Sequence, residues 1–161
     1  MHDLTIRLAE PRDRDVIADF NARLAAETES KALDRQTVRA GVQALLDDPR
    51  KGRYFVACDG PRVVAQLMHT FEWSDWRNGD IWWLQSVYVH PDYRRRGLMR
   101  RLFERVLHEA ETDPHVVGVR LYVEHGNHPA QAVYEHLGLR EAGYHVMEKM
   151  FNPLPRTRSG S

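Results

Sequence analysis

The residues best suited to chemistry form the run Arg94-Arg95-Arg96-Gly97-Leu98-Met99. This run follows the apolar residues 81–89, which are typical of a buried strand, and it leads into an amphipathic helical pattern. A strand, a loop and a helix in this order direct unpaired backbone N–H groups and the positive end of a helix dipole at one point. The run therefore predicts a site for a phosphate or diphosphate group.

A second group of residues follows after one further predicted strand. Asn127, Ala130 and Tyr134 have the spacing of a short helix that begins at an asparagine, and Gly138 supplies its C-terminal stop. The two groups are separated by a length of chain that one strand fills. Together they predict an enzyme that holds a phosphate-bearing cofactor and acts on a substrate beside it.

The composition restricts the classes of protein to which the chain can belong. Its 161 residues are 42% hydrophobic, enough for one domain, expected over residues 1–152 with a disordered tail at 153–161. Lys+Arg and Asp+Glu both number 23, so no overall charge draws the chain to nucleic acid or to an anionic membrane. The single Cys58 excludes an intramolecular disulfide and a cysteine-based zinc site. Since no membrane-length apolar run or signal peptide is evident, a soluble cytoplasmic protein is expected.

Hydrophobic periodicity and turn residues predict an alternation of strands and helices. Residues 116–123 follow a strand and a helix closely enough to predict a crossover between parallel neighbours. The continuous apolar character of residues 81–89 places that strand inside the sheet. The expected strands are residues 4–8, 54–58, 63–71, 81–89, 116–123 and 144–150, and the expected helices cover residues 16–25, 37–46, 98–110 and 130–137.

Between about Arg53 and Met150 the chain resembles the GNAT N-acetyltransferase superfamily. In that family Arg or Gln, two variable residues, Gly, one variable residue and then Gly or Ala wrap the pyrophosphate of acetyl-CoA. The run that begins at Arg94 has this spacing, with Met99 where a small residue is expected. The second signature, of Asn, Ala, Tyr and then Gly-Leu, is matched by Asn127, Ala130, Tyr134 and Gly138-Leu139. Across residues 81–89 the chain is most similar to the diamine and small-amine acetyltransferases.

The resemblance implies an α/β (α+β) fold of the GNAT type. Its central sheet would be mixed and mostly antiparallel, with a parallel strand pair around the cofactor cleft and about four flanking helices. It also implies acetyl-CoA as cosubstrate, no metal, a small-molecule or peptide amine as acceptor, and a possible homodimer. The implied cofactor-binding residues are Val87, Tyr88 and Val89 on the strand, Arg94, Arg95, Arg96, Gly97, Leu98, Met99 and Arg100 at the loop, and Asn127. For Arg101 and Arg105 a solvated helix face is expected instead.

Tyr134 and Gln85 are the expected catalytic residues. Attack of an amine on the thioester expels a thiolate, and a phenol near the sulfur can donate a proton to it. The alternative for Tyr134 is a core tyrosine with one hydrogen bond. Gln85 stands where the diamine acetyltransferases place Glu; it takes up no proton but can orient a water that does. Ser86, Glu72, His69 and bulk water remain open as alternatives for the base.

The resemblance places the acceptor near the turn between the first two helices and the hairpin before the strand at 81–89. Glu27, Glu72 and Trp73 are the expected substrate-binding residues, because carboxylates beside indole faces suit a cationic amine. An exposed polar loop above packed tryptophans explains the same residues equally well. His125 and His128 are three residues apart, but no third ligand is implied, so no metal is expected.

Two further readings of the chain remain open. Met99 and Gln85, which depart from the family pattern, are compatible with a GNAT-fold module that binds an acyl-CoA or regulates without transferring anything. A peptide or protein N-acetyltransferase would instead need an open acceptor groove.

Overall fold

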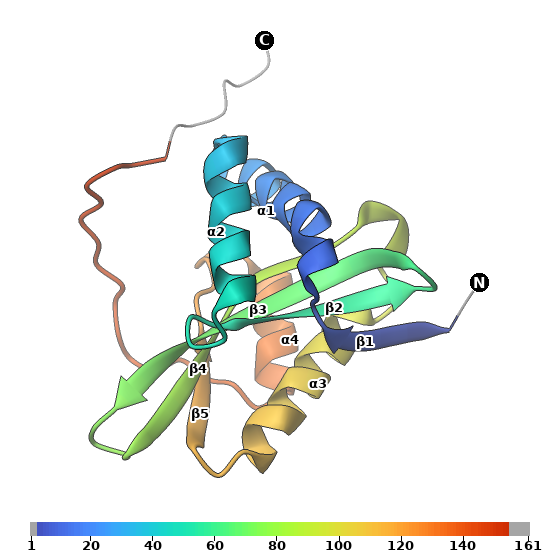
Figure 1. Ribbon diagram of the computed structural model, residues 1–161. Helices are drawn as coiled ribbons and strands as arrows, with labels where there is room; N and C mark the ends of the chain where they lie inside the picture. Colours follow the sequence, from blue (N-terminus) through green and yellow to red (C-terminus); the bar gives the residue numbers. More distant parts are fainter. Residues whose placement is uncertain (1–2, 155–161) are drawn as a thin grey trace.

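The computed structural model describes residues 3–154 and shows one five-stranded sheet with helices on both faces (Figure 1). Up to residue 137 its elements match the expected order. The strands are β1 (Leu4–Leu8), β2 (Arg53–Asp59), β3 (Arg62–Ser74), β4 (Gly79–Val89) and β5 (Val116–Leu121). The helices are α1 (Arg14–Glu29), α2 (Arg35–Asp47), α3 (Leu98–Thr112) and α4 (His128–His136), with short 3-10 turns at Pro11–Asp13 and Pro91–Tyr93.

The sheet has the order β1-β2-β3-β4-β5. Its first three pairings are antiparallel, and β4 pairs with β5 in parallel. Short turns join β2 to β3 and β3 to β4, whereas β1 reaches β2 through α1 and α2. The parallel pair is joined through α3, as the crossover prediction requires. The predicted fold class, a mixed and mostly antiparallel sheet with one parallel pair and four flanking helices, is confirmed.

Two apolar clusters hold the helices to the sheet, one on each face. On one face α3 and α4 cover the strands, with Phe55, Trp82 and Phe103 among the fully buried residues. On the other face α1 and α2 lie over β2, β3 and β4, with Ile17 and Val56 fully buried. Each such side chain contributes about 1.5–3 kcal/mol to folding. None of the helices within residues 3–154 combines the length and the apolar character that crossing a membrane requires.

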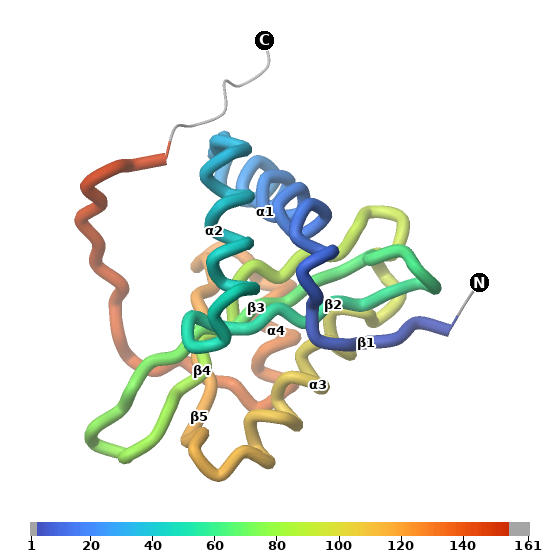
Figure 2. The backbone as a smooth tube through the Cα atoms, viewed as in Figure 1, coloured from blue at the N-terminus to red at the C-terminus, as the bar shows by residue number. Residues whose placement is uncertain are grey.

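The strand expected at residues 144–150 is absent from the structure. The chain from 139 to 154 contains neither helix nor strand and, after Leu139, is exposed throughout. Figure 2 shows this segment as an extended tube that leaves the sheet and the helices on one side of the molecule. A local apolar pattern gives a strand only where an adjacent edge accepts its backbone hydrogen bonds. In this chain those bonds are not made, so β5 remains the end of the sheet. Of the tail expected at 153–161, residues 155–161 lie outside the part that the structure describes.

His69 is completely buried on β3, and this bears on its possible role as a base. Its ring stacks on that of Trp82, with 3.8 Å between centroids and 7° between planes. Desolvation by burial lowers the pKa of His69 from 6.5 to about 4. At neutral pH His69 is therefore an uncharged core side chain, and it has no access to a substrate from solvent.

Replacing His69 with Phe is expected to flatten the dependence of stability on pH between about 6.5 and 4. Over this range the unfolded chain protonates the histidine first, so the wild type loses stability as the pH falls, by about 3 kcal/mol in all. Phenylalanine keeps the stacked ring and takes up no proton. Urea unfolding at pH 7, 5.5 and 4 measures the difference, with the exposed His108→Phe as control. Equal losses of stability in both variants would contradict the assignment.

Candidate active site

The site is centred where β4 and β5 separate. Their parallel ladder ends at the pair Leu84 and Leu121, while β4 continues to Val89. Just beyond this point the β3–β4 register shifts, and Ser86 adopts a left-handed backbone conformation with φ of 51°. Such a bulge turns the strand away from its neighbour. Backbone groups of β4 after Ser86 are consequently released from β5, and a ligand can pair with them.

A buried polar network holds the bulge in place. Gln66 on β3 is fully buried and donates from Nε2 to the Ser86 carbonyl oxygen at 3.1 Å and to Asn21 Oδ1 at 2.7 Å. Asn21 on α1 in turn donates from Nδ2 to the Tyr54 hydroxyl at 2.9 Å. A buried amide without such partners costs about 1–3 kcal/mol, so the network favours this one conformation of the backbone. None of these three residues was predicted to belong to the site, although a glutamine inside the apolar run of β3 was a signal.

The Arg-rich loop has the geometry of an anion site. Arg95 and Gly97 both have positive φ, 64° and 71°, and α3 begins directly after Gly97. The first N–H groups of α3 have no partner within the helix, and the positive end of its dipole lies at the loop. A Cβ built on Gly97 meets no atom within 4 Å, so the space in front of the loop is open. The backbone of residues 95–100 fits a diphosphate group.

A cavity of about 450 Å³ lies beside this loop, between the first turn of α3 and α4. Met99, the residue that departs from the family pattern, lines it together with Gly97, Arg100, Val133 and Leu137. The Met99 side chain also packs against the core cluster under α3. Part of the Met99 side chain is thus packed in the core, and the cavity beside it stays open.

The arginine side chains of the loop have protein partners. Arg94 bonds to the Val89 carbonyl oxygen and forms an ion pair with Glu27 at 2.9 Å. The guanidinium of Arg96 lies 5.1 Å from the centre of the Tyr93 ring. Arg100 pairs with Glu104 in the next turn of α3. An anion at this loop would therefore meet the backbone N–H groups before it met a free guanidinium from these three side chains.

Arg101 and Arg105 differ from the solvated helix face that was expected. Arg101 donates to the Leu4 carbonyl oxygen at 3.1 Å and Arg105 to that of Ile6 at 3.0 Å. Both residues thereby fasten the outer edge of β1 to α3. Unpaired carbonyl groups on an edge strand attract such donors, and neither arginine points to the phosphate loop.

Tyr134 lies on the inner side of α4, half-buried, with its ring centre 5.2 Å from that of Phe103. It packs against the same core cluster as Val87 and Leu121, which flank the separation of β4 and β5. Burial raises the pKa of Tyr134 above the ordinary value for a phenol. Burial is the only cause of this shift, and within the described residues no hydrogen bond to the Tyr134 hydroxyl is found.

The remaining predicted cofactor and catalytic residues surround this opening. Asn127 caps α4, where its Oδ1 accepts the Ala130 N–H at 3.3 Å. Tyr88 is buried against Phe20 on the α1 face, so only its backbone can reach a ligand on the opposite face. Gln85 donates from Nε2 to Thr70 Oγ1 at 2.7 Å. Its amide is thereby oriented, and its Oε1 stays available as an acceptor.

The three predicted substrate-binding residues do not form one pocket. Glu27 bonds to Arg94 and to the Tyr88 hydroxyl, next to the phosphate loop. Glu72 pairs with Arg120 at 2.7 Å and lies opposite Ile81, near the other end of β4. Seven residues of strand, about 23 Å, separate the two places. The side chain of Trp73 is 62% exposed. Both carboxylates are thus neutralised by an arginine, which the sequence did not indicate.

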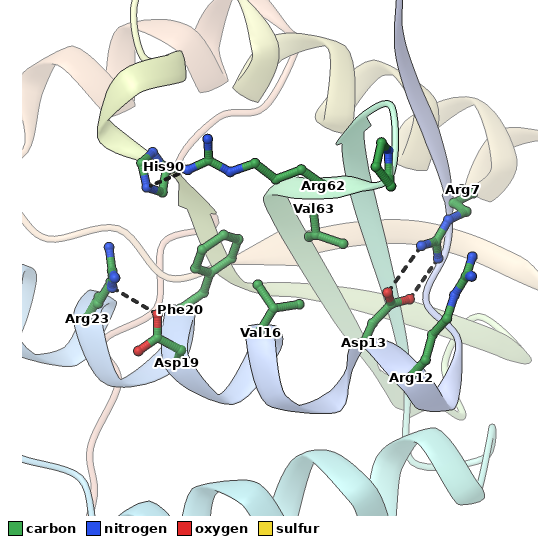
Figure 3. Close-up of a pocket in the computed structure, with 11 residues that line it drawn as sticks. Arg7, Arg12, Asp13, Val16, Asp19, Phe20, Arg23, Arg62, Val63 and His90 are labelled. Atoms are coloured by element: carbon green, nitrogen blue, oxygen red, sulfur yellow. Dashed lines mark hydrogen bonds and ion pairs between the residues drawn. The ribbon is translucent and has the colours of Figure 1, made fainter. Parts of the chain in front are cut away.

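A second cavity, of about 430 Å³, lies between the first half of α1 and the β2–β3 turn (Figure 3). It is rich in arginine, and two of these charges are compensated inside it. Arg7 pairs with Asp13 at 2.7 Å, and Arg23 pairs with Asp19 at 2.9 Å. None of the predicted site residues lines this cavity. Elsewhere in residues 3–154, no three His, Cys, Asp or Glu side chains gather as a metal ion would require.

Comparisons with known proteins agree with this geometry. Residues 18–139 match the model of the acetyltransferase (GNAT) family. The chain is similar to thialysine N-epsilon-acetyltransferase of Bos taurus, 32% identical over 82 residues, which are 51% of this chain and 47% of that protein. It is also similar to the [ribosomal protein bS18]-alanine N-acetyltransferase of Salmonella typhimurium, 46% identical over 59 residues, 37% of this chain and 39% of that protein. The matches thus span less than half the length of these two relatives.

A solved structure resembles the whole domain more closely. It is that of a possible acetyltransferase from Clostridium difficile 630, with a TM-score of 0.87 and 47% sequence identity. The alignment covers 93% of this chain and 99% of that one. The likeness therefore extends to the segments outside the two motifs.

Proposed function

Because the chain belongs to the acetyltransferase (GNAT) family, we propose that it transfers the acetyl group of acetyl-CoA to a primary amine. The observation that carries the proposal is the bulge at Ser86, which opens β4 beside the anion-binding loop at Gly97. A cosubstrate with a diphosphate and an amide-bearing arm needs these two features side by side. Acetyl-CoA would supply the acetyl group as an activated thioester.

The residues of the chain have separable tasks in this reaction. The backbone N–H groups of residues 95–100 bind the diphosphate, and Val87 and Val89 offer backbone groups to the amide-bearing arm. A backbone N–H at the bulge stabilises negative charge that develops on the carbonyl oxygen. The network of Gln66 keeps that N–H in one orientation. Much of the rate then comes from positioning two substrates against each other.

Two protons must move for the transfer to complete. An ammonium acceptor with a pKa of about 10 must lose one before it attacks, and a water oriented by Gln85 can receive it. Tyr134 donates the other to the departing thiolate. Attack is direct, with no acyl-enzyme, because Cys58 is buried on β2, away from the opening. Of the earlier candidates for the base, buried His69 is not supported by its position.

A small cationic amine is the acceptor class that we favour. The indoles of Trp73 and Trp76, 62% and 87% exposed, lie on the β3–β4 hairpin near Glu72. Glu72→Gln is expected to raise the KM for a diamine about five- to tenfold with little change in kcat, because it leaves the Arg120 guanidinium without its carboxylate partner, and this positive charge repels the second ammonium. Steady-state kinetics with a diamine and a matched monoamine measure this, with the exposed Glu111→Gln as control. Equal effects on both amines would contradict it.

A peptide or protein acceptor is the second candidate, favoured by the similarity to the Salmonella ribosomal-protein acetyltransferase. The match to that protein covers only 37% of this chain. We therefore do not assign its acceptor to this chain. The two candidates separate in one experiment, in which diamines, amino acids and N-terminal peptides compete for the same enzyme.

The proposal is tested by titrating the purified protein with acetyl-CoA in a calorimeter and then assaying a panel of amines. Micromolar binding followed by turnover of at least one amine is expected. Binding without any turnover would favour a catalytically silent acyl-CoA-binding module. Absence of binding would overturn the enzyme assignment altogether.

A further inference from the structure

We propose that the second cavity, between the first half of α1 and the β2–β3 turn, is a binding site for a small organic carboxylate. Arg62 and His90 bind the carboxylate group, and the apolar body of the ligand lies on the floor of the cavity. The site is separate from the Arg-rich loop at Gly97 and from the opening of β4. The proposal therefore does not depend on the acetyltransferase reaction.

Two hydrogen-bond donors face each other in the wall of this cavity. His90 Nδ1 accepts the Asp92 N–H at 3.2 Å, so in the neutral ring Nε2 carries the proton. The guanidinium Nη2 of Arg62 lies 3.2 Å from this Nε2, and a guanidinium has no acceptor atom (Figure 3). The Asp92 carboxylate lies on the other side of the ring, 3.7 Å from Nδ1. An anion between the two donors would accept from both, and the two oxygens of a carboxylate suit such a pair.

The charge of Arg62 is the one in this cavity that no ion pair within residues 3–154 neutralises. Each of the other arginines lining the cavity has a carboxylate partner, in the pairs Arg7–Asp13, Arg12–Glu10 and Arg23–Asp19. The guanidinium of Arg62 instead lies 5.6 Å from the centre of the Tyr93 ring. Asp59, opposite Arg62 in the strand register, accepts the Tyr93 hydroxyl at 2.6 Å. Arg62 is thus held beside the cavity by its stacking and remains available to an anion.

The acidic residues of the cavity do not offer a site for a cation. Asp13 is 4% exposed, and its carboxylate accepts two bonds from Arg7 and one from the Glu10 N–H. Asp19 lies between two arginines, at 2.9 and 3.2 Å. Because both carboxylates are already neutralised, recognition of a ligand by charge falls to the cationic side of the cavity.

Apolar side chains form the floor of the cavity. Val16 and Phe20 come from α1, and Pro61 and Val63 come from the β2–β3 turn and the start of β3. Phe20 and Val63 are buried and Val16 is half-buried. Figure 3 shows Val16 and Phe20 pointing from the helix toward the strand that carries Arg62. A volume of about 430 Å³ with an apolar floor and few polar groups is typical of a small-molecule site.

Benzoate is the probe, and benzamide is its control because it has the same ring without the charge. In an NMR titration of the isotope-labelled protein at constant ionic strength, benzoate is expected to shift the amide signals of Val16, Arg62 and His90. Binding in the millimolar range is expected, because so small a ligand makes few contacts. Benzamide should bind at least about tenfold more weakly, because it offers no charge to the guanidinium.

Arg62→Gln is expected to weaken the binding of benzoate at least about tenfold. Arg62 is exposed, so the variant should keep the circular dichroism spectrum of the wild type. Arg39→Gln is the matched control, because it removes the same charge from an exposed arginine on α2 that does not line the cavity. Its affinity for benzoate should equal that of the wild type.

The proposal is overturned if benzoate moves no amide signal around the cavity. It is also overturned if the shifts fall on residues 95–100 instead, which would place the anion at the Arg-rich loop. Equal binding of benzamide, or equal weakening in Arg62→Gln and Arg39→Gln, would show that the charge of Arg62 is not recognised. None of these outcomes bears on the binding of acetyl-CoA, so this proposal and the proposed function can fail separately.

Discussion

Gly97→Glu is expected to weaken the binding of acetyl-CoA at least about 100-fold. The added carboxylate would stand in front of the N–H groups of the loop and repel the diphosphate that they bind. It would also have to adopt φ of 71°, a conformation that costs a side-chain-bearing residue about 1–2 kcal/mol. Calorimetric titration of wild type and variant with acetyl-CoA gives the ratio directly.

Gly143→Glu is the matched control. Gly143 also has positive φ, 80°, and a Cβ built there likewise meets no atom within 4 Å. The same charge and the same strain are thus introduced away from the loop, and affinity for acetyl-CoA should stay at the wild-type level. If both variants bind as the wild type does, the loop is not the diphosphate site. If both lose binding, the loss at Gly97 reflects general damage.

Tyr134→Phe is expected to lower kcat at least about tenfold while acetyl-CoA affinity changes little. The substitution keeps the ring that packs on Phe103 and removes only the hydroxyl that can protonate the departing thiolate. Because burial raises the pKa of Tyr134, the phenol is fully protonated at neutral pH. Any fall in the kcat of the wild type from loss of this proton should therefore come only at a pH above the ordinary range of a phenol, and this alkaline limb should be missing in the variant.

Tyr144→Phe tests whether loss of any phenol has the same effect. Tyr144 is 73% exposed on the C-terminal segment, so its hydroxyl has no place at the reacting atoms. Steady-state rates across the neutral and alkaline range, with acetyl-CoA saturating, compare the two variants. Unchanged turnover in Tyr134→Phe would remove Tyr134 as the acid.

Local patterns were enough to predict most of the fold. Three of these patterns each involve only a few neighbouring residues: the apolar run of β4, the glycine after three arginines and the periodicity of α3. They predict a strand, a turn and a helix in that order, as the structure has them. The parallel pairing of β4 with β5 followed, because a crossover of this length leaves few other arrangements. The resemblance to the GNAT family rests on these same short-range features and is confirmed at the level of the family.

The same local reasoning failed wherever a feature depends on distant partners. Gln66, Asn21 and Tyr54 come from three elements, and only their packing together shows that they hold the bulge at Ser86. Glu27 and Glu72 carry the same charge in the sequence, but tertiary structure sends each to a different arginine.

Residues 144–150 make the contrast between local pattern and tertiary context plain. The side chains of these residues form an apolar pattern that is typical of a strand. Whether that segment becomes a strand depends on backbone hydrogen bonds to another edge, which no local pattern can supply. In the single chain the edge of β5 and the segment remain apart. Short-range patterns therefore predict the helices, the strands and the Arg-rich loop. The bulge, the partners of the charges and the open edge depend instead on contacts between residues far apart in the chain.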